Sequence, residues 1–546
     1  MAFLQDAPQL THTYRSDRLL LGLLDRALPA DRRDALDADL DALGDYALMA
    51  WQRAARSTRG KPVLVQWGAW GERIDRIELT TAWREGPVIT TTHNILASGH
   101  ADSEYARLEE FARVYLYHVA SEFYTCPLAM TDGATTALKA SGNQELIDRA
   151  LPHFLSRDPA RFWLSGQWMT ETVGGSDVSH TETTARQDAD GQWRLYGRKW
   201  FSSAVVGEAA LALARPAGAG DGNAALALFF VETMDGARRR PELVIDRLKD
   251  KLGTQELPTA EIHLDGLPAW PVGELAHGVR QVTPMLNITR TWNAVCAVAS
   301  MARAVTLAQD YAARRHAFGR PLIEQPLHAR TLSDMRTEFS GAFVLAFEVA
   351  HLLGRVEHGS ASAHEAALLR LLTPLAKLWT GKLAVTICSE ALECFGGAGY
   401  IEDTGLPQLL RDAQVYPIWE GTTNVLALDN LRALSGGGLQ ALRAASAAWM
   451  AGNDDPHAAS ATTQTLDASA RWLDRHGAAR DSLEAGARGL ALTLARCAAA
   501  ALLAREATWA SGRGDLHPAA ALQRFIAHGL DRLVTPDATS TALLLQ

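Results

Sequence analysis

Three long stretches in the second half of the chain place apolar residues three or four positions apart. They cover Met285–Phe318, Gln325–His358 and Ala363–Phe395, and each is more than 30 residues long. This spacing is typical of amphipathic helices, and helices of that length bury their apolar faces most readily against one another. The sequence therefore predicts a helical bundle over residues 276–436.

Residues 161–275 have a different sequence pattern, typical of short β-strands. Phe162–Thr170 is apolar and aromatic, and pairs such as Asp190-Gly191 and Asp265-Gly266 mark turns beyond it. Between such turns lie short segments that alternate apolar and polar residues, namely 181–186, 193–196, 224–231 and 261–264. Short strands with turns at this spacing predict a small β-barrel or β-sandwich.

Helical patterns flank the β-region on both sides. In the first 160 residues they include Asp31–Arg53, Tyr105–Phe123 and Ala134–Leu151, whereas Trp67–Thr92 has Trp-Gly and Gly-Pro breaks that predict a loop excursion. The glycine run at 435–438 reads as a linker to an Ala/Leu/Arg-rich helical segment. The predicted fold class is a multidomain α+β protein with an N-terminal helical domain (1–160), a β-domain (161–275), a helical bundle (276–436) and a C-terminal helical extension (437–546).

Composition limits the classes of function. The net charge is −9, which provides no overall positive field for a polyanion. The five cysteines include no C-x-x-C pair and indicate free thiols rather than a disulfide framework or zinc site. The 17 histidines show no H-E-x-x-H spacing, so we expect no metal. The sequence has neither a secretory signal pattern nor an uncharged apolar run of the ~20 residues that span a bilayer, so we expect a cytoplasmic protein without membrane contact.

One carboxylate, Glu420, lies between Trp419 and Gly421 in the stretch Tyr-Pro-Ile-Trp-Glu-Gly-Thr-Thr-Asn. An acid in apolar surroundings has a raised pKa and is suited to act as a general base. The alternative is an exposed acid near the positive end of a helix, with Thr422 or Thr423 as its cap. These nine residues alone leave both interpretations open.

Three further segments carry groups suited to a ligand, and each also has a purely structural interpretation. Thr170–Asp177 combines adjacent glycines with a serine, which suits a phosphate or a tight turn between strands. Gly197–Ser203 ends in hydroxyls beside aromatics, which suits a flat heterocycle or a filled barrel interior. Arg314–Leu322 ends a predicted helix with arginines beside Phe318, which suits a diphosphate or compensates the helix dipole.

In combination these motifs resemble those of the acyl-CoA dehydrogenase flavoproteins, over roughly residues 90–435. The chain has, in order, Thr-Glu-x-x-Gly-Gly-Ser-Asp, Gly-x-Lys-x-aromatic, Arg-x-x-Phe-Gly, Gly-Gly-x-Gly-Tyr, Leu-x-Arg-Asp-Ala and Trp-Glu-Gly-Thr. The segment Arg247–Gly253, Trp419 and the C-terminal extension are similar, more narrowly, to the AidB-like branch. That branch belongs to the adaptive response to DNA alkylation.

The resemblance implies FAD bound between the β-domain and the bundle, with an acyl-CoA thioester against the flavin. Glu420 matches the base that removes the α-proton while the β-hydride goes to flavin N5, and its backbone N–H would help to polarise the thioester carbonyl. Some family members carry the base one position before an arginine of an earlier helix. Here Thr289 occupies that position, which favours Glu420, and Arg290 would lie near the pocket.

The resemblance also implies which residues hold FAD and how the subunits assemble. Residues expected to contact the same subunit's FAD are Met169, Thr170, Gly175, Ser176, Phe201, Ser203, Thr422 and Asn424. Residues expected to reach a neighbouring subunit's FAD are Arg315, Phe318, Gly396 and Gly397. A homotetramer built as a dimer of dimers follows from this arrangement.

Rival functions on the same fold stay open. AidB-like proteins associate DNA binding with the C-terminal extension, but here residues 439–546 hold ten Arg and no Lys against ten Asp plus Glu. Arginines at 471, 475, 488 and 496 could still form a local patch for duplex DNA; the alternative is a solvated helical face. A protective DNA-associated flavoprotein, an oxidase of small nitro compounds and an acyl-CoA oxidase are therefore the alternatives to a dehydrogenase.

Overall fold

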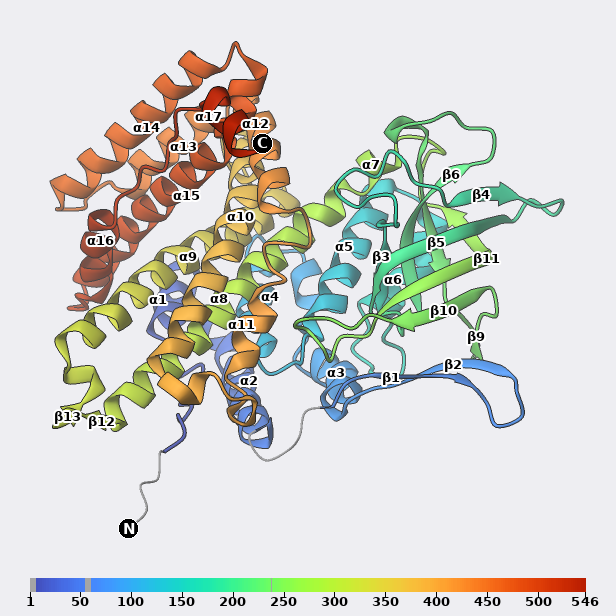
Figure 1. The fold of residues 1–546 in the computed structure, drawn as a ribbon, viewed down its shortest axis with the longest axis horizontal. Coiled ribbons are helices and arrows are strands. Elements are labelled where there is room, and N and C mark those ends of the chain that lie inside the picture. The colour runs from blue at the N-terminus through green and yellow to red at the C-terminus, as the bar shows by residue number, and fades with distance from the viewer. Residues whose placement is uncertain (1–5, 55–59, 237) are drawn as a thin grey trace. The chain divides into compact units, whose positions relative to one another are not determined.

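The computed structural model describes residues 6–54, 60–236 and 238–546 (Figure 1). Contacts between residues divide the chain into two compact units. The helical unit comprises residues 1–51, 102–116 and 293–546, and the β-unit comprises residues 52–101 and 117–292. As predicted, helical segments lie before and after a β-domain in the chain, and extra helices follow at the C-terminus.

The β-unit contains a closed barrel. The seven-stranded sheet that forms it comprises β3 (Ser165–Trp168), β4 (Thr184–Gln187), β5 (Trp193–Ser203), β6 (Ala209–Pro216), β7 (Ala227–Glu232), β10 (Leu243–Leu248) and β11 (Thr259–Pro271). Strand β11 pairs with β5 and β7, β6 pairs with β7 and β4, and β4 pairs with β5, so that the pairing returns to its starting strand. The structure thus selects a barrel over a sandwich, with β3 and β10 added at its sides (Figure 1).

The sequence pattern did not predict two strands of this sheet, β6 and β10. Strand β6 has an almost fully buried Ala/Leu sequence, so apolar residues do not alternate with polar ones. Strand β10 was also not predicted, although its residues Leu243 and Ile245 lie in the apolar core. The predicted strands at 181–186, 193–196, 224–231 and 261–264 overlap β4, β5, β7 and β11 and are confirmed.

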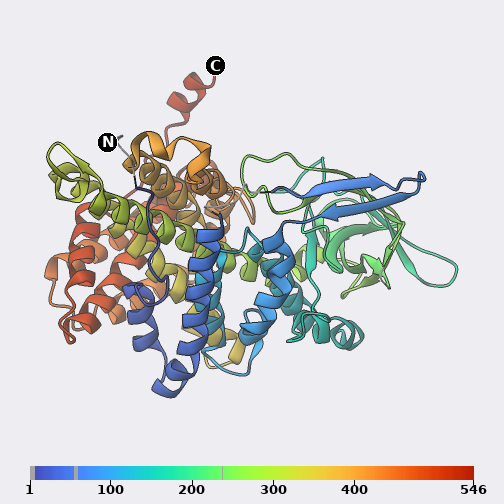
Figure 2. The same ribbon diagram turned by 90° about the horizontal axis from the view of Figure 1, so that it is seen from below.

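The predicted loop excursion at Trp67–Thr92 is wrong. This region continues the hairpin of β1 (Val63–Trp67) and β2 (Arg73–Glu78) and then forms helix α3 (Thr81–Thr92). The Trp-Gly break is the hairpin turn, and Pro87 lies inside the helix. The hairpin runs along the barrel because the Gln66 amide donates to the backbone carbonyls of Ile245 and Asp246, both at 3.1 Å (Figure 2).

The helical unit is built on the three long helices that the periodicity predicts. These are α8 (Thr283–Arg314), α9 (Pro326–His358) and α10 (Ala363–Cys394). Helix α10 begins with a capping box in which Ser362 and Glu365 each accept a hydrogen bond from the other's backbone N–H. Helices α9 and α10 pack against each other, and both pack against the C-terminal helix α15 (Arg480–Ser511).

Helices α9 and α15 are long and apolar enough to cross a bilayer. However, 83% and 89% of their most apolar windows are buried within the fold, as in core helices. The remaining helices are α1 (Arg18–Ala27), α2 (Ala30–Ala54), α4 (Ala106–His118), α5 (Thr125–Ser141), α6 (Gln144–Phe154), α7 (Gly278–Gln281), α11 (Pro407–Ala413), α12 (Thr423–Ser435), α13 (Gly438–Trp449), α14 (Pro456–His476), α16 (His517–Ala527) and α17 (Ala538–Leu544). The expected linker at 435–438 is only the short break between α12 and α13.

All five cysteines are free thiols, as the composition indicated. Cys388 and Cys394 lie in the apolar surroundings of α10, where burial raises the pKa of each thiol to about 12. Both therefore stay protonated at neutral pH and act as core residues.

Candidate functional site

Glu420 lies in a strained turn between α11 and α12. Its backbone φ is +57°, and that of the following Gly421 is +98°. Residues other than glycine rarely adopt this left-handed backbone conformation. It costs them about 1–3 kcal/mol and persists only where surrounding contacts impose it. The Glu420 side chain is half-buried. A strained acid of this kind is a mark of a functional position.

The turn begins at a tyrosine that the bundle holds firmly. The hydroxyls of Tyr416 and Ser300 on α8 are 2.7 Å apart, and the amide of Asn293 donates to the Tyr416 carbonyl at 3.4 Å. Burial raises the pKa of Tyr416 well above its ordinary value, so the phenol stays neutral. Helix α8 therefore fixes the start of the segment that presents Glu420.

Helix α12 begins directly after the strained turn. Thr422 occupies the N-cap position in an extended conformation, but its side chain makes no capping hydrogen bond to the described backbone. Thr423 is the first helical residue and is buried, whereas Asn424 is exposed. The capping interpretation of this motif is therefore wrong for the side chain of Thr422, a half-buried residue two positions after Glu420.

In the β-unit, the end of β5 presents an exposed aromatic face. Phe201 is 52% exposed, and the neighbouring Lys249 ammonium lies 4.6 Å from its ring centroid and 3.3 Å from that of Trp200. The Ser203 hydroxyl is half-buried and lies 3.1 Å from the Thr259 hydroxyl of β11. An open ring beside hydroxyl groups suits the flat face and polar edge of a heterocycle.

A buried ion pair anchors the Thr170–Asp177 loop next to this surface. The Lys199 ammonium donates to the Glu171 carboxylate at 2.6 Å and to the Leu213 carbonyl at 2.7 Å. Glu171 also accepts from the Thr183 hydroxyl at 2.6 Å and from the backbone N–H of Glu182 at 2.7 Å. Strand β5 and the segment just before β4 thus both donate to one carboxylate at the start of the loop, whose tip stays exposed.

Electrostatics at Glu171 favour its charged form. Burial alone would raise the pKa of the carboxyl, but the Lys199 ammonium and the donors from Thr183 and Glu182 bring the pKa below its ordinary value. A buried charge that is paired and hydrogen-bonded in this way is costly to disturb. The sequence motifs contained both residues, but their role was missed because strands far apart in the chain bring them together.

The β-unit residues fit the FAD that the resemblance implies. A side chain at Gly175 would place its Cβ 2.9–3.0 Å from the Thr170 side chain, so the loop requires glycine where it folds back on itself. Ser176 is exposed at the loop tip, and Met169 and Thr170 are half-buried at its base. Together with Phe201, these residues supply backbone donors, a hydroxyl and an aromatic surface for a dinucleotide.

In the helical unit, the Arg-x-x-Phe-Gly motif forms a small exposed hairpin. Strands β12 (His316–Ala317) and β13 (Arg320–Pro321) pair across Phe318 and Gly319, whose φ values are +52° and +83°. Phe318 is 98% exposed and Arg315 is half-buried at the hairpin's base. An aromatic held outward in a strained turn is suited to a partner surface rather than to the core.

The glycine motif is exposed in the same unit. Gly396 and Gly397 begin the 3₁₀ helix η4 (Gly396–Gly399) at the end of α10. Gly396 has a φ of +59°, and a Cβ at either residue would meet nothing within 4 Å. These glycines therefore leave a bare backbone edge that a ligand can approach closely.

The predicted site residues fall into two groups, one in each compact unit. Those in the β-unit are Met169, Thr170, Gly175, Ser176, Phe201, Ser203 and Arg290. Those in the helical unit are Arg315, Phe318, Gly396, Gly397, Glu420, Thr422 and Asn424. Arg290 is half-buried on the first part of α8, next to Thr289, whose hydroxyl donates to the Leu286 carbonyl at 3.3 Å.

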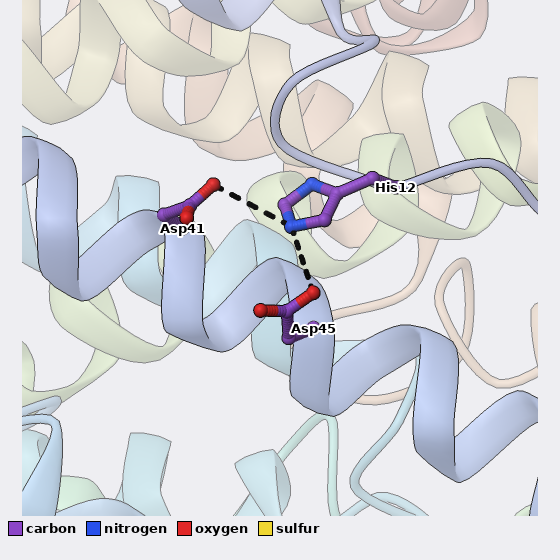
Figure 3. A group of neighbouring side chains, drawn as sticks. All are labelled: His12, Asp41 and Asp45. Atoms are coloured by element: carbon purple, nitrogen blue, oxygen red, sulfur yellow. Dashed lines mark ion pairs between the residues drawn. The ribbon is translucent and has the colours of Figure 1, made fainter.

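Among the residues that the structure describes, one group of side chains has metal-binding chemistry, and it includes none of the predicted site residues. His12 Nε2 is 3.5 Å from an Asp41 oxygen and 3.3 Å from an Asp45 oxygen, both on α2 (Figure 3). Arg15 donates to both Asp41 oxygens, and a Cβ at Gly44 would meet the His12 ring at 2.2 Å. These contacts attach the N-terminal segment to α2 through ion pairs and close packing.

The possible arginine patch of the C-terminal extension does not include Arg496. That guanidinium is buried, donates to both oxygens of Glu338 at 2.7 and 3.0 Å, and lies 4.3 Å from the Phe525 ring centroid. It holds α15 against α9 and α16 instead of facing solvent. Arg471, Arg475 and Arg488 are exposed.

Comparisons with known proteins agree with this arrangement. Residues 276–435 match the acyl-CoA dehydrogenase C-terminal domain and residues 166–267 match the acyl-CoA dehydrogenase middle domain. Residues 6–158 match the adaptive response protein AidB N-terminal domain. Three domain models therefore match in the order that the helix–β–helix architecture requires.

Individual relatives are similar over most of their length. Acyl-CoA dehydrogenase family member 11 of Caenorhabditis elegans is 43% identical over 80% of this chain and 72% of that protein. The putative acyl-CoA dehydrogenase AidB of Escherichia coli is 35% identical over 68% of this chain and 69% of that protein. The crystal structure of C. elegans ACDH-11 in complex with C11-CoA superimposes with a TM-score of 0.92 at 38% identity, covering 97% of this chain and 93% of that chain. The chain thus belongs to the acyl-CoA dehydrogenase family of FAD-dependent oxidoreductases and carries the N-terminal domain of its AidB branch.

Proposed function

We propose that this protein is an acyl-CoA dehydrogenase in which Glu420 removes the α-proton of an acyl-CoA thioester. FAD, when bound, supplies the acceptor for the β-hydride, so that a saturated acyl group becomes a trans-enoyl group. The single observation that carries the proposal is the strained, half-buried Glu420 in its left-handed turn. The ACDH-11 complex with C11-CoA supports an acyl-CoA as the substrate.

The chain's own residues would share the work as follows. The Glu420 carboxylate accepts the α-proton. The backbone N–H of the same residue donates to the thioester carbonyl, which makes the α-proton more acidic. The resemblance implies that Trp419 would narrow the acyl pocket beside the base and that Arg290 would lie near it. Thr289 cannot act as a base, which leaves Glu420 in that role.

The FAD contacts stay as the resemblance implied them. Met169, Thr170 and Ser203 would face the flavin edge, and Phe201 would pack on the ring. Ser176 and Gly175 would line the phosphates, with Thr422 and Asn424 on the ADP half. The exposed face of Phe201 supports this assignment, since it offers a ring where the cofactor is expected.

The test is anaerobic mixing of the purified flavoprotein with a panel of straight-chain acyl-CoAs. The flavin absorbance should bleach with at least one chain length, and the product should have two hydrogens fewer than the substrate. Absence of bleaching with every chain length would refute the dehydrogenase. The same panel in air distinguishes an oxidase, which would form peroxide.

A homotetramer is part of this proposal, and Phe318 provides its test. Phe318→Ala should leave the fold intact, because a 98% exposed side chain adds little to stability within one chain. We expect the variant to lose most of its bound flavin and to dissociate, measured by absorbance and light scattering. Leu516→Ala removes another exposed apolar residue and is the control. A Phe318→Ala tetramer with full flavin content would contradict this arrangement.

The alternative is a cytoplasmic flavoprotein that protects DNA from alkylation, and the exposed Arg471, Arg475 and Arg488 favour it. We nevertheless expect no shift of duplex DNA at about 0.15 M salt, since the extension is charge-balanced and Arg496 is paired internally. A gel-shift titration over several salt concentrations measures this. A shift that the triple variant R471A/R475A/R488A abolishes, with a salt slope lowered by about 1 per lost phosphate contact, would instead favour the DNA-associated function.

A further inference from the structure

Besides the site residues, a buried lysine contacts the turn that presents Glu420. Lys377 lies in the middle of α10 with no exposed surface, and its ammonium donates to the carbonyl oxygen of Gly421. Gly421 directly follows Glu420 and shares its left-handed conformation. The contact therefore restrains the peptide group between Gly421 and Thr422, which directly follows the base in the same turn.

Lys377 is one of three residues on one face of α10, here called the stripe, that contact the chain from Tyr416 to α12. Arg370, Lys377 and Gly381 are seven and four positions apart, so they share a helical face. Arg370 donates to Asp429 of α12 at 2.7 Å. A Cβ at Gly381 would come within 3.0 Å of the Tyr416 carbonyl, so only glycine there lets the backbone pass so closely. Figure 1 shows α10 and α12 side by side.

The contacts of this stripe meet the strained segment at its start, its middle and its end. Gly381 admits the start of the turn, Arg370 fixes the helix after it, and Lys377 holds the carbonyl between them. A left-handed glutamate relaxes unless such contacts over-determine it. A charged donor makes a hydrogen bond about twice as strong as a neutral one, and the buried Lys377 ammonium supplies such a donor to this carbonyl.

We propose that Lys377 is a positioning residue for the base, which keeps the Glu420–Gly421 turn left-handed and so keeps the Glu420 carboxylate at the reacting carbon. The inference rests on the proposed function of Glu420. It assigns Lys377 no contact with substrate or cofactor. In the sequence, a lysine within the apolar part of α10 indicates a buried cation that needs a partner. Only the structure shows that this partner is the Gly421 carbonyl.

The test compares Lys377→Met, which keeps the length of the side chain but removes the ammonium, with Lys377→Arg. Lys382→Met, an exposed lysine of the same helix, is the matched control. In flavin-loaded Lys377→Met we expect kcat to fall by about 10- to 100-fold with little change in KM, because a small misplacement of a catalytic group has effects of this size. The isotope effect from an α-deuterated acyl-CoA should grow, since proton removal becomes slower. Lys377→Arg should recover part of kcat, and Lys382→Met should match the wild type.

A purely structural role would give a lower Tm with unchanged kcat per bound flavin and an unchanged isotope effect, and this result would overturn the proposal. If the wild type itself fails to bleach with acyl-CoA, the proposed function fails, yet the inference is still tested by a crystal structure. Lys377→Met should then show Glu420 outside the left-handed region. A turn that keeps its conformation without the ammonium would contradict the inference. Should Lys377→Met not fold, Lys377→Gln, which replaces the ammonium by a shorter neutral donor, carries the same test, and a wild-type kcat per bound flavin in that variant would overturn the proposal.

Discussion

Glu420→Gln is expected to lower the rate of flavin bleaching by acyl-CoA about 10³-fold while leaving flavin content unchanged. The amide keeps the size of the side chain but cannot accept a proton, and removal of a general base typically costs 10²- to 10⁴-fold. Anaerobic stopped-flow absorbance measures the rate. Glu484→Gln, an acid in a surface ion pair of α15, is the control and should behave as wild type.

The contrary result would be bleaching by Glu420→Gln at a rate close to that of the wild type. A loss of flavin together with the loss of bleaching would mean that the substitution disturbs the turn, and the rate per bound flavin would then decide. Because Thr289 occupies the other position at which family members carry the base, no second acid is expected to substitute.

Lys199→Met is expected to destabilise the β-unit by about 3–5 kcal/mol, because it leaves the Glu171 carboxylate buried without its cation. For a domain of this size that corresponds to a fall in Tm of roughly 10 °C. Thermal unfolding followed by circular dichroism measures the change. The control is Arg198→Met on the same strand as Lys199, which removes a surface ion pair with Asp246. It should lower the free energy of unfolding by less than about 1 kcal/mol.

The pH dependence of this variant separates the ion pair from simple packing. In the wild type the pKa of Glu171 lies below its ordinary value, so its stabilisation is complete above that value and is lost as the pH falls through the lowered pKa. Without Lys199, burial dominates and should raise the pKa, so acid should stabilise the variant relative to neutral pH. The Tm difference between the two proteins should therefore be smaller at about pH 5 than at about pH 8. A difference independent of pH would indicate lost packing alone.

The helices were predictable because their apolar spacing is a local property of the chain. Residues 325–358 and 363–395 match α9 and α10 nearly end to end, and Gly359 supplies the left-handed cap that separates them. The barrel was only partly predictable. Its strand β6 is buried on both faces, so alternation is absent and an Ala/Leu run gives no strand signal.

The site was predictable by residue type and not by conformation. Nothing in the sequence Trp-Glu-Gly-Thr shows that the glutamate itself, in addition to the glycine, is left-handed. That conformation depends on α8 and α10, whose residues lie far away in the sequence. The ion pair of Glu171 with Lys199 and the contact of Lys377 with Gly421 escaped prediction for the same reason, since each joins residues 28 or 44 positions apart. Local patterns identify elements and motifs, whereas distant contacts set their geometry.

The most direct measurement is a crystal structure of the wild-type protein with FAD and an acyl-CoA that it cannot turn over. If Glu420 is the base, its carboxylate should place an oxygen within about 3 Å of the substrate's α-carbon, with φ of Glu420 still positive. A carboxylate that points away from the thioester, or a protein that binds no FAD, would contradict this assignment.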